Sequence, residues 1–184
     1  MSTSVALLRA VNVGGQNRVG MSALRDMFAA LGFPGARTLL HSGNVVFDAH
    51  GKSGPALERI LEDATKRKLS LAVDYVVRSA AEWEALVRGN PFATEAKRDP
   101  ARVHVVCLKR APAAAALRTL EAGIRGREVV RLRGRELYAV YPDGMGRSKL
   151  TNTVIERLLG TRGTARNWNT VLKLAALVRG GEGA

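Results

Sequence analysis

The chain has 184 residues, enough for one large domain or two small ones. With 46% hydrophobic residues and a mean hydropathy of -0.05, its composition is that of a folded globular protein and excludes a disordered chain. No apolar run approaches the roughly 20 residues of a membrane span, and the N-terminal segment lacks the apolar core of a secretory signal, so we expect no membrane partner. A single cysteine excludes an intrachain disulfide, and we expect a cytoplasmic protein.

The formal net charge of +13 is unevenly distributed along the sequence. Residues 1–100 carry 13 Lys and Arg against 10 Asp and Glu, whereas residues 101–184 carry 16 against 6. Such an excess predicts polyanionic partners, either nucleic acid or a phosphorylated small molecule. A bias of composition explains the charge equally well, because 22 of the 29 cations are arginine in a chain rich in alanine and glycine.

The first half of the chain has the pattern strand, helix, strand, strand, helix, strand. This is the order of a ferredoxin-like unit. Residues 36–49 form either two short strands that turn at Ser42-Gly43-Asn44 or one long strand with a bulge at the glycine. The other expected elements are a strand at residues 5–11, a helix capped by Ser22 and closed by Gly32, a helix that begins near Pro55, and a strand at residues 71–77.

The second half repeats this pattern without its last strand. We therefore expect an α+β fold of two ferredoxin-like halves, residues 1–80 and a strongly basic 81–184, the second with an extra C-terminal helix in place of the last strand. The expected elements are a helix at 80–88, a loop at 89–100, a strand at 102–109, a helix at 113–122, a hairpin of 129–133 and 136–141, a helix at 149–159 capped by Ser148, and a helix at 171–178.

The loop after the first strand is rich in glycine and in hydrogen-bond donors. Residues 15–22, GQNRVGMS, differ from a Walker A motif in one position, because Met21 stands where the phosphate-binding lysine belongs. No aspartate ends a later apolar strand in a Walker B position, so we do not expect an NTPase. Gly14 and Gly15 either bind an anion through backbone N–H groups before a helix or permit positive φ in a tight turn.

Two asparagines interrupt apolar segments of the first half. Asn12 ends the first strand, and Asn44 follows the turn at Ser42 and Gly43. Because the first strand is commonly central in a ferredoxin-like sheet, we expect the two asparagines to lie near each other. Buried amides need hydrogen-bond partners, which either a ligand or the protein itself can supply. The Ser-Gly-Asn segment is equally well explained as an ordinary turn.

The basic half contains a further polar constellation in the segments RSKLTN and TARNWNT. Lys149 and the arginine before Ser148 would flank a capped helix N-terminus, where cations are unfavourable unless an anion is bound. Trp168 is a candidate for stacking on a base or sugar, or else for packing between helices. Capping of the last helix explains some of the polar residues in TARNWNT without a ligand.

Signals for catalysis and metal binding are poor. His41, His50 and His104 lack metal-ligand spacing with one another and with Cys107, so we expect no metal and no cofactor. The chain also lacks a GxSxG motif and a carboxylate pair in an apolar setting, so the sequence shows no general base.

Three separated motifs resemble a bacterial family catalogued as domain of unknown function 1697. The resemblance lies in LLRAVNVGGQNRVGMSALRDMFAALGF, in RTLLHSGNVVF, and in SKLTN with TARNWNTVLKL, in this order from residue 7 to residue 174. It implies an α+β fold of ferredoxin-like units and brings no established activity. Gly20, His41 and Ala10 stand where the family pattern has Pro, Gln and Gly. We therefore interpret the Walker-like spacing, which Gly20 creates, as accidental.

These observations predict a protein that binds a phosphate-bearing ligand or nucleic acid in a groove between its halves. Two alternatives remain open: an enzyme acting on a small phosphorylated or amide-containing metabolite, and polar motifs that only stabilise the fold. The sequence predicts no oligomeric state. The candidate ligand-binding residues are Asn12, Gly14, Gly15, Asn17, Arg18, Ser42, Gly43, Asn44, Ser148, Lys149, Asn152, Arg166, Asn167, Trp168 and Asn169.

Overall fold

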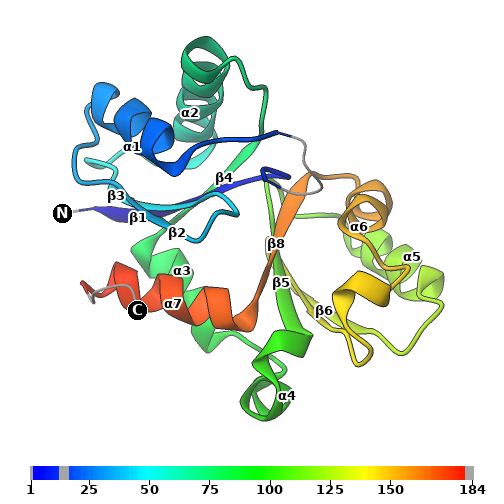
Figure 1. The fold of residues 1–184 in the computed structure, drawn as a ribbon. Helices are drawn as coiled ribbons and strands as arrows, with labels where there is room; N and C mark the ends of the chain where they lie inside the picture. Colours follow the sequence, from blue (N-terminus) through cyan, green and yellow to red (C-terminus); the bar gives the residue numbers. More distant parts are fainter. Residues whose placement is uncertain (1, 13–16, 181–184) are drawn as a thin grey trace. The chain divides into compact units, whose positions relative to one another are not determined.

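The structure, a computed structural model, describes residues 2–12 and 17–180 (Figure 1). The chain forms two compact units: unit 1 comprises residues 1–85 and 173–184, and unit 2 comprises residues 86–172. Each unit contains one four-stranded antiparallel sheet. The C-terminal helix contributes its residues from 173 onward to unit 1, whereas the sequence grouped that helix with the second half.

Unit 1 has the strand order β2-β3-β1-β4. Helices α1 and α2 cover one face of this sheet (Figure 1). Its elements are β1 (Thr3–Leu8), α1 (Met21–Ala30), β2 (Arg37–Leu39), β3 (Asn44–Asp48), α2 (Gly54–Leu69), β4 (Tyr75–Ser79) and the first residues of α3 (Ala80–Arg88).

The core of unit 1 lies between its sheet and these two helices. Because side chains alternate along a strand, Ala6 and Leu8 of β1 point to the helical face, where both are fully buried. Three phenylalanines complete this core, and two of their ring contacts are edge-on. The ring centroids of Phe28 and Phe47 lie 5.0 Å apart, and those of Phe33 and Phe47 lie 5.2 Å apart.

Helix α7 (Trp168–Val178) is tied to unit 1 through its C-terminal half. The guanidinium of Arg37 on β2 donates a hydrogen bond of 2.8 Å to the carbonyl of Leu177. Arg179, just beyond the helix, makes two hydrogen bonds of 2.8 and 2.9 Å to the carboxylate of Glu84 on α3. Such a two-pronged arginine–carboxylate pair fixes geometry as well as charge.

Unit 2 has the strand order β6-β7-β5-β8, which matches that of unit 1 strand for strand. Helices α5 and α6 cover one face of its sheet and enclose a core that includes Val106, Leu137 and Ile155 (Figure 1). Its elements are the end of α3, α4 (Ala93–Arg98), η1 (Pro100–Arg102), β5 (Val103–Leu108), α5 (Ala114–Gly123), β6 (Val129–Arg133), β7 (Glu136–Val140), η2 (Met145–Arg147), α6 (Asn152–Leu159), β8 (Gly163–Asn167) and the start of α7.

The ferredoxin-like arrangement predicted for both halves is confirmed. The prediction that the second half lacks its last strand is wrong, because unit 2 contains β8. Strand β8 pairs with β5 along five residues, from Leu108 opposite Gly163 to His104 opposite Asn167. The segment lacks the apolar pattern of a strand, since Thr164 and Arg166 are polar. Both side chains are nevertheless buried, with relative exposures of 4% and 7%. Helix α7 therefore follows the last strand and does not replace it.

Two predicted helix caps are wrong. Helix α1 begins at Met21 after Gly20, and Ser22 lies inside its first turn. Helix α6 begins at Asn152, and its cap is Thr151, whose hydroxyl accepts a hydrogen bond from the backbone N–H two residues into the helix. Near α6 the chain offers Ser148, Thr151 and Thr153 as caps, and at α1 the helix starts one residue before Ser22, so local backbone geometry decides which residue precedes the helix.

Several predicted boundaries also differ. The two-strand alternative around residues 42–44 is confirmed by β2 and β3. The strand predicted at 5–11 ends at Leu8, although Val11 is still buried, and the strand predicted at 71–77 begins only at Tyr75. The loop predicted at residues 89–100 contains helix α4.

Candidate functional site

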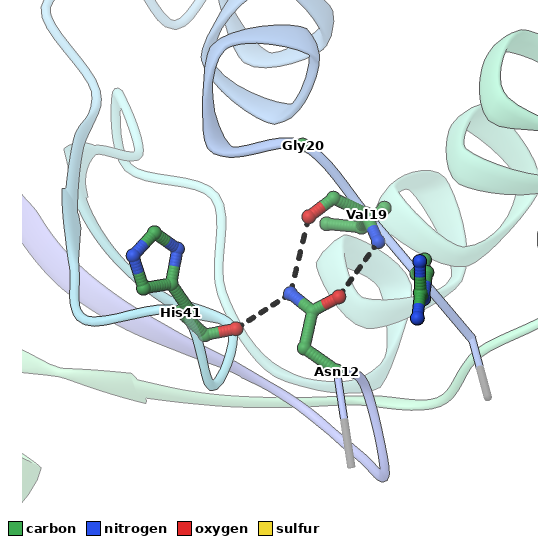
Figure 2. A pocket seen from close by; sticks show the side chains of 5 residues that line it. Asn12, Val19, Gly20 and His41 are labelled. Carbon is green, nitrogen blue, oxygen red and sulfur yellow. Dashed lines mark hydrogen bonds between the residues drawn. The ribbon is translucent and has the colours of Figure 1, made fainter. Parts of the chain in front are cut away.

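A pocket of about 470 Å³ opens in unit 1 beside the start of α1. Its lining comes from three segments: the chain after β1, the segment before α1, and the loop between β2 and β3 (Figure 2). The lining residues are Asn12, Arg18, Val19, Gly20 and His41. Arg18 carries the permanent charge of this set, and none of the five has a carboxylate.

The amide of Asn12 joins the loops around the pocket (Figure 2). Its oxygen accepts a hydrogen bond of 2.9 Å from the backbone N–H of Val19, and its nitrogen donates to the carbonyl of Val19 at 3.1 Å and to that of His41 at 2.6 Å. The amide thus replaces backbone pairing that a strand would otherwise provide. It fixes the segment before α1 against the loop between β2 and β3.

Asn17 holds the other end of the same loop. Its amide nitrogen donates to the carbonyl of Ala10 at 3.1 Å, and its own carbonyl accepts a 3.1 Å bond from the backbone N–H of Asn12. The predicted candidates Gly14 and Gly15 lie outside the described residues. The two hydrogen bonds of Asn17 join the described residues before this segment, Ala10 and Asn12, to the described residue after it.

Strained backbone conformations gather in these two loops. Ala10, Asn12, Asn17 and Leu40 have φ between +50 and +58°, and they are four of the six non-glycine residues with positive φ in the described part of the chain. This conformation is common for asparagine but rare for a residue as bulky as leucine. Backbone strain of this kind is characteristic of binding and catalytic sites.

The first turn of α1 has no side-chain cap. Gly20 precedes the helix with extended backbone (φ -74°, ψ 133°) and provides no side-chain cap. Among the described residues no side chain accepts a hydrogen bond from the first N–H groups, and the first turn has no acidic residue. These N–H groups carry the positive end of the helix dipole. Because Gly20 and Arg18 both line the pocket, the pocket combines an uncapped helix start with a guanidinium.

The predicted Ser42, Gly43 and Asn44 support this region without lining the pocket. The Asn44 amide is fully buried and donates to the carbonyl of Leu39 at 2.8 Å and to the Ser42 hydroxyl at 3.0 Å. Gly43 has φ +73°, and a Cβ there would lie 2.5 Å from the Val11 side chain. The turn therefore requires glycine for both its conformation and its packing.

The candidates in RSKLTN lie away from any helix N-terminus except Asn152, because α6 starts later than predicted. The Ser148 hydroxyl accepts a 2.9 Å bond from the N–H of Leu150 and donates to the Glu128 carboxylate. Lys149 is exposed. The Asn152 amide donates to the carbonyl of Gly163 at 3.0 Å and so joins α6 to β8. The predicted cap of α6 at Ser148 is therefore wrong, whereas anion binding by these residues stays a prediction.

The candidates in TARNWNT serve the junction of β8 and α7. Burial lowers the pKa of the Arg166 guanidinium to about 10, and the group donates to the Thr164 hydroxyl at 2.7 Å. Asn167 accepts a 3.0 Å bond from the N–H of Thr170, as a helix cap does. Trp168 is only 6% exposed, so its ring packs inside the protein, whereas Asn169 is exposed.

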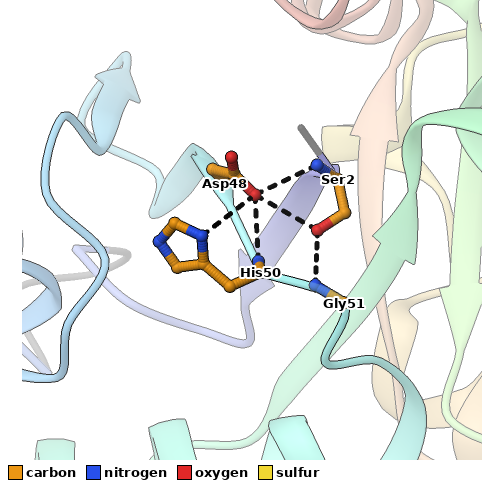
Figure 3. A network of polar contacts seen from close by, with 4 residues as sticks. All are labelled: Ser2, Asp48, His50 and Gly51. Atoms are coloured by element: carbon orange, nitrogen blue, oxygen red, sulfur yellow. Dashed lines mark hydrogen bonds and ion pairs between the residues drawn. The ribbon is translucent and has the colours of Figure 1, made fainter.

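A serine, an aspartate and a histidine form a separate polar cluster in unit 1 (Figure 3). One oxygen of Asp48 accepts bonds from the backbone N–H and hydroxyl of Ser2 and from the N–H of His50. These bonds, that of His50 first, lower the pKa of the carboxyl. The hydroxyl proton points to the aspartate and not to the imidazole, so the cluster lacks the order of a catalytic triad. It ties the start of β1 to the end of β3.

The structure thus brings together Asn12 and Arg18 among the predicted candidates and holds Asn17 beside them. Val19, Gly20 and His41 were not among the predicted site residues. The signal for Gly20 was present in the sequence, since a glycine directly before a helix can leave that helix uncapped. Among the described residues, no three His, Cys, Asp or Glu side chains gather as a metal site would need.

Within the described part of the chain, no helix has both the length and the apolar character to cross a membrane.

Comparison with known proteins identifies a family and a solved structure with a similar fold. No curated protein matches the sequence. A solved structure described as a conserved bacterial protein, SP0830 from Streptococcus pneumoniae, is similar at 20% identity and a TM-score of 0.74, covering 96% of this chain and 98% of its own. The family described as protein of unknown function (DUF1697) matches residues 1–138, and the chain belongs to this family.

Proposed function

We propose that the pocket at the start of α1 binds the phosphate group of a small phosphorylated molecule or of nucleic acid. The observation that carries this proposal is the joint position of Arg18 and the uncapped helix start in a pocket lined by no carboxylate. Backbone N–H groups at a helix start and a guanidinium are both preferred partners of phosphate oxygens.

The size and the scaffold of the pocket support the same interpretation. Its volume of about 470 Å³ lies in the usual range for small-molecule sites. The Asn12 amide is already engaged with the backbone of Val19 and His41, so it holds the loops in place before a ligand arrives. Such preorganisation lowers the entropic cost of binding. In this proposal the protein acts in the cytoplasm, where its single buried cysteine stays reduced.

A substitution at Gly20 tests the proposal, because a carboxylate there competes with the ligand for the same N–H groups. A Cβ at Gly20 meets no atom within 4 Å and φ is negative, so a side chain fits. Aspartate caps helices well, so Gly20→Asp should raise the free energy of unfolding by about a few tenths of a kcal/mol. Phosphate binding should weaken at least about tenfold, because the carboxylate also repels the ligand. Calorimetric titration of the full chain with pyrophosphate measures the affinity.

The matched control is Gly20→Asn, which caps the same N–H groups without a charge and should weaken binding less than aspartate does. A short single-stranded oligonucleotide replaces pyrophosphate in a parallel titration, where a steep loss of affinity with salt identifies nucleic acid as the ligand. Equal affinity of the wild type and Gly20→Asp for pyrophosphate would show that the start of α1 is not the site. An absence of binding to either probe would leave only a structural role for these loops.

A further inference from the structure

A second pocket, of about 450 Å³, lies in unit 2 where α6 ends and β8 begins. It is rich in guanidinium groups that the sequence motifs did not point to. Its lining residues are Arg110, Thr153, Glu156, Arg157, Gly160, Thr161 and Arg162. Three arginines, two threonine hydroxyls and one carboxylate therefore surround one hollow.

The two pockets lie at the same end of their sheets, although the first is lined from the start of α1 and the second from the end of α6. Strands β1 and β5 occupy the same position in the strand orders of their units. The first pocket is lined by Asn12, shortly after β1, and the second by Arg110, shortly after β5. In each unit the residues that follow this strand can therefore contribute to a pocket at the same end of the sheet.

Two hydrogen bonds join the chain segments that carry Arg110 and Arg162. The N–H of Arg110 donates to the Thr161 hydroxyl at 3.3 Å, and the N–H of Lys109 donates to the carbonyl of Arg162 at 2.9 Å. Arg157 stands in the last turn of α6. The three guanidinium groups thus start from three separate segments that the fold holds together around the hollow.

The balance of charge in the pocket favours an anion. Within the described chain, the Arg110 and Arg157 guanidinium groups take part in no hydrogen bond or ion pair. The carboxylate of Glu156 already accepts a 2.8 Å bond from the N–H of Gly163 on β8. A cation in the last turn of a helix also interacts favourably with the carbonyls at its C-terminal end. Arg157 can therefore stabilise α6 without binding a ligand.

We propose that Arg110, Arg157 and Arg162 bind a phosphate ester group, at a site separate from the pocket of α1. A planar guanidinium group can donate two parallel hydrogen bonds to the oxygens of a phosphate. Three such groups from different segments therefore favour phosphate over chloride. The Thr153 hydroxyl, exposed on the same wall of α6, supplies a further donor. This proposal does not depend on the function proposed for α1.

Titration of the full chain with inorganic phosphate, at constant ionic strength set by sodium chloride, tests this site. The side-chain Nε–Hε NMR signals of the three arginines should shift and saturate together. Arg157→Gln should weaken the affinity about tenfold through loss of charge-assisted hydrogen bonds. The matched control, Arg118→Gln on α5, removes the same charge from an exposed position outside the pocket and should leave the affinity unchanged.

Glu156→Gln separates binding from a structural role of the arginines. Glutamine keeps an oxygen for the N–H of Gly163 but removes the charge, so phosphate should bind about threefold or more tightly. Unchanged or weaker binding in this variant, equal losses in Arg118→Gln and Arg157→Gln, or the same shifts with chloride would each overturn the proposal. Gly20→Asp should leave these arginine shifts unchanged, which keeps the two sites distinguishable. Comparison of adenosine monophosphate with a ten-nucleotide DNA identifies the source of the phosphate, because only a polynucleotide site gains affinity with length.

Discussion

Three of the motif asparagines use their amides on the protein's own backbone, each in a different way. Asn12 joins two loops, Asn44 donates within a buried turn, and Asn167 caps the start of α7. Each amide compensates backbone groups that a turn or a helix end leaves without partners. In the function proposed for the pocket of α1, a ligand would therefore meet N–H groups and Arg18, while the asparagines keep the surrounding loops in shape.

Asp48 provides a pH-dependent contact at the residue scale. Its pKa is lower in the folded chain than in the unfolded one, chiefly because the His50 N–H donates to it, so its stabilising effect is complete above about pH 4 and is lost as the pH falls through the folded value. Asp48→Asn should therefore lower the melting temperature at neutral pH. The difference from the wild type should shrink as the pH falls below about 4 and the carboxyl is protonated. Thermal unfolding followed by circular dichroism over this range measures it.

The control for this prediction is Asp63→Asn. Asp63 is exposed on α2 and takes part in no hydrogen bond with the described residues, so its substitution should leave the melting temperature unchanged at every pH. A difference between Asp48→Asn and the wild type that stays constant as the carboxyl is protonated would contradict the assigned role of the carboxylate.

At the scale of elements, carboxylates protect the outer edge of a strand in each unit. The N–H groups of Tyr75 and Val77 on β4, an edge strand, donate bonds of 3.0 Å to Glu62 and Glu58 of α2. On β8, the edge strand at the same place in unit 2, Gly163 donates to Glu156 of α6. Unpaired edge N–H groups invite pairing with another chain. The helix after the third strand therefore both covers the core and closes the edge.

Glu58 offers a direct test of this protection. The side chain is 2% exposed, and Glu58→Met removes the acceptor at nearly constant size. The N–H of Val77 then loses its partner, which should lower the free energy of unfolding by about 1–3 kcal/mol. Glu58→Gln keeps an acceptor oxygen and should cost less. Urea denaturation measures the stability, and light scattering should show faster aggregation of the methionine variant. Equal stability of the two variants would show that the acceptor atom is not what matters.

The elements that the sequence predicted well are those whose apolar pattern decides the structure. Strand β3 and helix α3 follow such patterns, and helix α3 matches the prediction residue for residue. Strand β8 was missed because Thr164 and Arg166 are polar, and their burial depends on the pairing of this segment with β5, which is far away in the sequence. The lining of the candidate pocket was predicted in part: Arg18 could be named from its loop, whereas the position of His41 depends on how two loops meet. Arg110 and Arg157 carry no motif, and only the fold brings them together.

At the scale of the whole molecule, the positive charge belongs mainly to one unit. Unit 2 carries 17 Lys and Arg against 7 Asp and Glu, a net charge of +10, whereas unit 1 carries 12 against 9, a net charge of +3. The ion pairs of Arg102 with Asp99 and of Arg127 with Asp143 in unit 2 are exposed, and such pairs contribute little to stability. Repulsion among like charges should therefore destabilise unit 2 more than unit 1.

Salt should relieve this repulsion selectively. Raising sodium chloride from about 0.05 to about 0.5 M shortens the Debye length from roughly 14 Å to roughly 4 Å, which screens most interactions between exposed charges. Amide hydrogen exchange of the full chain should then slow more in β5 and β7 than in β1 and β3, the inner strands of the two sheets. The strands of unit 1 serve as the internal control in the same sample. An equal change in both sheets would show that the charges of unit 2 are already balanced by its fold, and that its excess of arginine has no energetic consequence for folding.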